Sequence, residues 1–231
     1  MLSPPFLVNT AIVNGVIISG IVVTLFIMWF SLRKYEGYFS EKKLFLSFLA
    51  GIAMGFVIII IEFLTSSASS IVIFLLFPLM EQLSKLMILN HRTFREKKDT
   101  PIYGLAVGLG FGSIFVPIST LVFLRGKVPE LTFAVVSIII GLALIFLHGA
   151  TGSMIGYGIG YMGGERKWYY FFLSVIAVMP VRPIMAIPTG TVYVATSIVL
   201  VYGVIIYTYA VSKLLLLALP RKERRLKKSF N

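Results

Sequence analysis

Long runs of apolar residues follow one another along the sequence, separated by short polar stretches. A helix needs roughly 20 apolar residues to cross a hydrocarbon core about 30 Å thick. Hydrophobic residues make up 58% of the 231 residues and charged residues 13%, against roughly 45–50% and 25% in soluble domains, so a water-soluble fold could not cover this much apolar surface. The runs predict an all-α, polytopic membrane bundle of about seven transmembrane helices, at 6–32, 44–64, 71–89, 102–124, 131–162, 169–187 and 191–217.

The polar stretches between these runs are too short to form a domain of their own. The sequence therefore predicts a single transmembrane domain over 1–219 and a basic tail over 220–231. Because the chain contains no cysteine, disulfides and thiolate metal ligands are excluded. We expect a multi-pass protein of the cell membrane that acts in or at the bilayer.

The positive charges are concentrated in every second connection between the predicted spans. Cytoplasmic loops of membrane proteins are enriched in Lys and Arg, so this pattern predicts an external N-terminus and a cytoplasmic C-terminus. The net charge of +12 then indicates topology and not a nucleic-acid interface, and the tail is expected to lie along anionic lipid headgroups. The predicted external loops hold only Arg125 and Lys127. Outside the tail, the predicted cytoplasmic connections hold Arg33, Lys34, Lys42, Lys43, Arg92, Arg95, Lys97, Lys98, Arg166 and Lys167.

Apart from Lys213 near the end of the last run, five acidic or basic residues lie inside predicted spans, where charge is costly and is usually functional. Glu62 and Arg182 lie nearer the external side, and we expect them to have a structural role as a pair. The other three, Glu81, Lys85 and His148, lie in the third and fifth spans.

The charges of the third span lie in the predicted cytoplasmic half of the membrane. Glu81 and Lys85 are four residues apart, so they share one helical face and can form an ion pair that only fixes helix packing. At a rise of about 1.5 Å per residue, Glu81 lies roughly 10–15 Å from the cytoplasmic end of its helix. His148, Phe111 and Ser113 reach the same layer from two other spans. The three spans can therefore converge on one site.

Three segments on successive spans carry a family pattern. The first covers 77–85 and includes Glu81, Gln82 and Lys85; the second covers 99–111 and ends in Gly-Leu-Gly-Phe; the third covers 148–152 and begins with a histidine. Together they resemble the PrsW-type intramembrane proteases, within the wider group of CAAX-prenyl proteases and bacteriocin-immunity membrane proteins. That family shows Glu-Glu-x-x-Lys, Gly-Leu-Gly-Phe-x-x-x-Glu and His-x-x-x-Gly motifs. The PrsW-like core covers about 71–162.

The resemblance implies a membrane endopeptidase that cuts a membrane-anchored protein or peptide near the cytoplasmic side. A carboxylate of the family activates water, or holds a metal that does so, and a histidine binds the metal or stabilises the oxyanion. Glu81 would be the base, His148 the stabiliser or ligand, and Lys85 a positive charge that favours the ionised carboxylate. The supporting residues would be Gln82, Phe111 and Ser113.

Two positions depart from the family pattern, and both replace expected carboxylates. Gln82 stands where the first motif has its second Glu, and Phe115 stands where the second motif has its Glu. Glu81 and His148 give two clear ligands for a divalent ion such as zinc, whereas catalytic zinc usually takes three protein ligands. These departures indicate a proteolytic site that keeps the architecture of the family but whose chemistry is weakened or lost.

Two other functions fit the same features. A catalytically inactive family member would act as a membrane scaffold or substrate-binding protein, and the replaced carboxylates favour that alternative. A transporter or channel would also have buried charges and kinked spans, although the sequence shows no inverted repeat of the kind transporters have.

Overall fold

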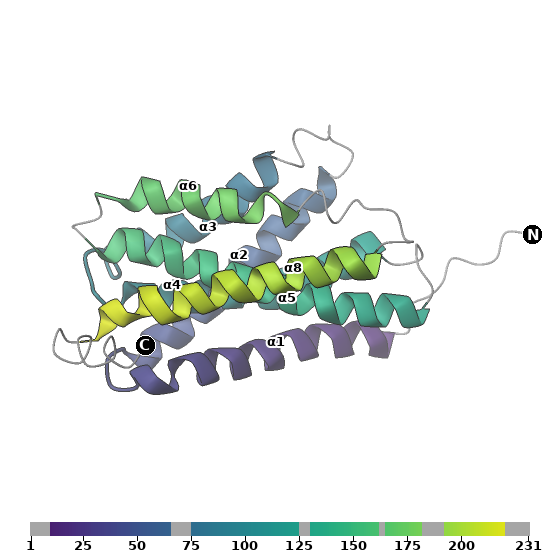
Figure 1. The fold of residues 1–231 in the computed structure, drawn as a ribbon, viewed down its shortest axis with the longest axis horizontal. Helices are drawn as coiled ribbons and strands as arrows, with labels where there is room; N and C mark the ends of the chain where they lie inside the picture. The colour runs from purple at the N-terminus through teal and green to yellow at the C-terminus, as the bar shows by residue number, and fades with distance from the viewer. Residues whose placement is uncertain (1–9, 66–74, 125–129, 162–164, 182–191, 220–231) are drawn as a thin grey trace, which may run out of the picture.

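The computed structural model describes residues 10–65, 75–124, 130–161, 165–181 and 192–219. All regular secondary structure in these ranges is helical (Figure 1). Each α-helix overlaps one predicted apolar run. The short helices η5 and η6 continue α8, and η1 (Arg33–Tyr35) follows α1. The helices are α1 (Thr10–Leu32), α2 (Glu41–Leu64), α3 (Phe77–Leu89), α4 (Thr100–Leu124), α5 (Glu130–Gly160), α6 (Lys167–Val178), α8 (Val192–Tyr209), η5 (Ala210–Leu214) and η6 (Leu215–Ala218).

The all-helical fold class is confirmed, with seven α-helices in the described part of the chain. Three helical stretches there are long and apolar enough to cross a membrane: Glu41–Leu64, Val135–Gly160 and Tyr193–Ala218. Thr100–Ile114 and Lys167–Val178 are shorter apolar helices. The number of membrane crossings and the orientation of the chain stay predictions.

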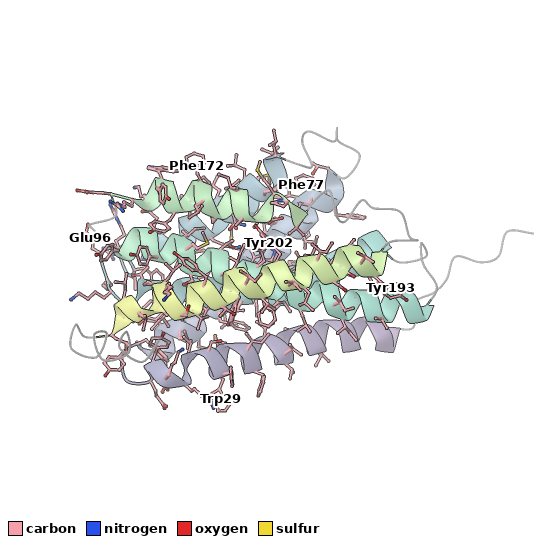
Figure 2. The ribbon with its side chains drawn as sticks, in the orientation of Figure 1. Trp29, Phe77, Glu96, Phe172, Tyr193 and Tyr202 are labelled. Atoms are coloured by element: carbon pink, nitrogen blue, oxygen red, sulfur yellow. The ribbon has the colours of Figure 1, made fainter. Side chains whose placement is uncertain are left out.

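The outward faces of the helices are apolar. Trp29 on α1 and Phe172 on α6 are 59% and 55% exposed, and both point away from the bundle (Figure 2). Large exposed apolar faces would be a liability in water, whereas a bilayer covers them at no cost. The surface therefore agrees with the lipid environment that the composition predicts.

Helix α4 forms the centre of the bundle and packs most extensively against α5 and α2. Its contact with α5 is made at glycines: a Cβ atom at Gly108 would overlap the carbonyl oxygen of His148, and one at Gly104 would overlap that of Gly152. A Cβ atom at Gly110 would likewise overlap the carbonyl oxygen of Phe48 on α2. Small residues let membrane helices approach to backbone contact. This close approach fixes where His148 lies relative to α4.

The connections that follow α1, α3 and α5 gather at one end of the bundle, on the left in Figure 1. The backbone amide of Ser40 donates to the Tyr103 hydroxyl at 3.0 Å, and that of Glu96 donates to the carbonyl of Ile159 at 3.4 Å. The Tyr35 hydroxyl donates to the carbonyl of Val211 at 3.1 Å. The basic residues of these connections therefore share one end, here called the basic end, while Arg125, Lys127 and the tail lie outside the described residues.

Candidate functional site

The site is built around the side chain of Lys85 on α3. Its Nζ atom donates to Gln82 Oε1 at 3.1 Å on the same helix and to Thr151 Oγ1 at 3.0 Å on α5. It also lies 3.0 Å from Nδ1 of His148, one helical turn before Thr151. One ammonium group therefore joins two helices through three polar partners.

Helix α4 contributes an aromatic wall to this cluster. The ring centroid of Phe111 lies 4.9 Å from that of His148 and 5.0 Å from the Lys85 Nζ atom. An ammonium over an aromatic face is stabilised by the ring quadrupole, and more so when both groups are desolvated. The predicted convergence is thus observed for three helices, α3, α4 and α5, at Lys85, Phe111 and His148.

All members of the cluster are inaccessible to solvent: Lys85 has no exposed surface and His148 is 1% exposed. A buried charge is tolerated only where its hydrogen bonds are satisfied. An ammonium has three N–H donors and no acceptor, and Lys85 has three partners. Hydrogen bonds to a charged group contribute about 1.5–3 kcal/mol each, so these contacts offset part of the cost of burial.

When Lys85 is protonated, its hydrogen-bond partners assign one tautomer to His148. Gln82 Oε1 can only accept, and the Thr151 hydroxyl donates to the carbonyl of His148 at 3.1 Å, so it accepts from Lys85. The third N–H of a protonated Lys85 then points to Nδ1 of His148, which accepts it. In a neutral imidazole the proton is then on Nε2, which is a donor.

Glu81 lies four residues before Lys85 on α3 and is 1% exposed. Among the described residues, the hydrogen bonds of Lys85 run to Gln82, His148 and Thr151 and not to the carboxylate of Glu81. The two opposite charges still share one face of the helix, at a spacing where they attract each other. Helix α3 runs from Phe77 toward the end of the bundle where Glu96 lies (Figure 2).

The other predicted residues make no hydrogen bond to Lys85 or lie outside the described chain. Ser113 is buried on α4, and its hydroxyl donates to the carbonyl of Gly110 at 2.7 Å. Glu62 is buried near the end of α2, but Arg182 lies outside the described residues, so their pairing stays a prediction. The side chain of Phe115 also lies outside them.

Thr151 is a site residue that the sequence analysis missed. It lies three residues after His148, a spacing that places two side chains on the same face of a helix. Its position within the third motif segment, one turn from the histidine, is the signal that could have identified it.

The three segments that carry the family motifs thus meet at one buried polar cluster, the arrangement expected for the intramembrane protease class that they resemble. A family model described as "PrsW family intramembrane metalloprotease" matches residues 11–186, more than half of the chain. The chain therefore belongs to the PrsW family. Searches of curated proteins and of solved structures returned no match.

The family description implies a metal ion, and the described residues do not offer a suitable set of ligands for one. Within the described residues, no group of three His, Asp or Glu side chains is placed to hold an ion. A metal-bound histidine usually donates its second ring N–H to an acceptor, whereas the group at Nδ1 of His148 is the side chain of Lys85, a donor when protonated. A divalent ion held by Glu81 and His148, the two possible ligands that the sequence offers, is thus not supported by the group next to His148.

Proposed function

We propose that the protein is an intramembrane endopeptidase that cleaves membrane-anchored substrates from the basic end of the bundle. The main observation behind this proposal is that residues of two family motifs are in contact: the Lys85 Nζ atom lies 3.0 Å from Nδ1 of His148. Membership of the PrsW family supports a protease function. The substrate and the side of cleavage are part of the proposal.

Glu81 is proposed as the general base. Its carboxylate takes a proton from a water molecule while the water oxygen bonds to the carbonyl carbon of the scissile peptide. The carbonyl π electrons move onto oxygen, and a tetrahedral oxyanion forms. When this intermediate collapses, the C–N bond breaks and the proton held by Glu81 passes to the leaving amine.

His148 is proposed to stabilise the oxyanion through its Nε2–H group. Donors that are already oriented stabilise developing charge without reorganisation, which makes them effective in a site that excludes water. Gln82 can add a second donor, because its Nε2 group is buried and has no hydrogen-bond partner among the described residues. Lys85 holds Gln82 and His148 in place from one atom.

The proposed side of cleavage follows from the position of Glu81 on α3. Leu89, the last residue of α3, lies eight positions after Glu81, which corresponds to about 12 Å at 1.5 Å per residue. The connections beyond this end are basic, and basic connections favour the cytoplasm. Because the cluster is buried, a peptide reaches it only when the helices separate, as lids and loops do in other enzymes.

The test is cleavage of a panel of single-span membrane substrates by the purified full chain in liposomes. We expect Glu81→Gln to reduce the rate about 10²–10⁴-fold, the contribution of a general base. We expect His148→Ala to reduce it about 10²–10³-fold, the effect of removing an oxyanion donor. Glu41→Gln and His91→Ala are matched controls on exposed residues of the same types, and both should cleave at the wild-type rate.

An inactive scaffold is the second candidate, and the observation that favours it is Gln82, which binds Lys85 where the family motif has a carboxylate. Folded wild-type protein that cleaves no faster than Glu81→Gln would contradict the endopeptidase and support the scaffold. The experiment would then turn to membrane proteins that copurify with the chain.

A further inference from the structure

The surroundings of the Lys85 Nζ atom are those of a bound cation. Two oxygens and one ring nitrogen lie 3.0–3.1 Å from it, contributed by two different helices. The ring of Phe111 lies 5.0 Å away on a third helix. These are hydrogen-bond lengths to an ammonium.

The acceptors around this atom are a poor set for a divalent ion. An amide oxygen, a hydroxyl and one imidazole carry no negative charge, whereas zinc sites are built from thiolate, imidazole and carboxylate ligands. The same three groups suit an ammonium, which needs only one acceptor for each of its N–H bonds.

The second ring nitrogen of His148 is disfavoured as a metal ligand for a related reason. To bind an ion through Nε2, the ring must carry its proton on Nδ1 and donate it to an acceptor. At 3.0 Å from Nδ1 the structure places the Lys85 side chain, and an ammonium has no acceptor to offer. A divalent ion at His148 would also sit close to an existing positive charge, with little solvent to screen it.

We propose that the Lys85 ammonium is the resident cation of this site and takes the place of a metal ion in this chain. It holds α3 against α5 and supplies a positive charge one helical turn from Glu81 along α3. The fold of the protein then depends on Lys85 and not on bound metal.

The first arm of the test measures metal content. The full chain is purified in detergent, incubated with zinc and freed of unbound ion, and the zinc bound per chain is measured for the wild type and for His148→Ala. We expect the same substoichiometric content in both. Stoichiometric zinc in the wild type that His148→Ala loses would overturn the proposal.

The second arm measures thermal stability in the same detergent. Lys85→Met fills similar space without the charge, and it leaves the buried Gln82 oxygen and the His148 nitrogen without their donor. We expect Tm to fall by roughly 5–15 °C. Lys213→Met, at an exposed lysine on η5, should melt with the wild type, and a chelator should leave the wild-type Tm unchanged.

An unchanged Tm for Lys85→Met would overturn the proposal. A lower Tm of the wild-type protein in the presence of a chelator would also overturn it. If Lys85→Met yields no folded protein, the zinc content and the chelator response of the wild type still decide. Neither arm requires proteolysis, so a failure here is distinguishable from a failure of the endopeptidase proposal.

Discussion

Helix α5 packs against two neighbours in opposite ways, and His148 takes part in both contacts. Against α4 the contact is backbone on backbone, with the carbonyl oxygen of His148 lying where a Cβ atom of Gly108 would be. Against α3 the contact is made by polar side chains, with Lys85 reaching the His148 ring and Thr151. The first contact has no chemistry to offer but fixes the position of the histidine. The second has the reactive groups but depends on that position.

The largest effect on this comparison is expected from Gly108→Ala. The new methyl group overlaps backbone of α5, which cannot move aside as a flexible side chain would. We expect a loss of about 3 kcal/mol, equivalent to a fall in Tm of roughly 6–12 °C, measured by thermal unfolding in detergent.

Gly112→Ala is the matched control on the same helix. A Cβ atom there lies 3.2 Å from the Cα atom of Ile145 and 3.5 Å from the Cβ atom of His148, so a shift of a few tenths of an ångström relieves it. Equal losses for the two variants would show that the backbone contact at Gly108 is not special.

A smaller effect is expected from Thr151→Val, which keeps the shape of the side chain and removes one acceptor from Lys85. Because the lost hydrogen bond is to a charged group, we expect a cost of about 2 kcal/mol, measured as a fall in Tm. The helix backbone around position 151 should stay as it is.

Thr24→Val is the control for this variant. Thr24 is also fully buried, but its hydroxyl donates to the carbonyl of Gly20 within its own helix, at 2.6 Å. Removal of such a local bond should cost less than about 1 kcal/mol. If Thr24→Val lowers Tm as much as Thr151→Val does, the hydrogen bond from Lys85 to Thr151 adds no stability beyond that of any buried threonine hydroxyl.

Much of the bundle was predictable because the apolar runs are governed by one dominant constraint, the thickness of the bilayer. The runs at 102–124 and 131–162 end within a few residues of α4 and α5. Residues 71–74 of the third predicted run lie outside the described residues. From Phe77 on, α3 carries Pro78 in its first turn, where a missing N–H costs nothing.

The partners of Lys85 were not predictable from its own helix. The side chain of a helical residue leans toward the N-terminus of its helix. The Lys85 side chain therefore lies over the preceding turn, which carries both Glu81 and Gln82. The choice of Gln82 depends on where His148 and Thr151 of α5 lie, and that is set by the glycine contact with α4. Spacing along one helix carries no information about a neighbour such as His148, which lies 63 residues further along the chain.

The most direct test of the central contact is the protonation of the His148 ring, read by ¹⁵N NMR of histidine-labelled protein in detergent. The chain has two histidines, so the His148→Ala spectrum assigns the remaining signals to His91. We predict that His148 has its proton on Nε2, with Nδ1 accepting from Lys85, and that added zinc leaves these signals unchanged. A proton on Nδ1, or a shift of the His148 signals when zinc binds, would contradict it.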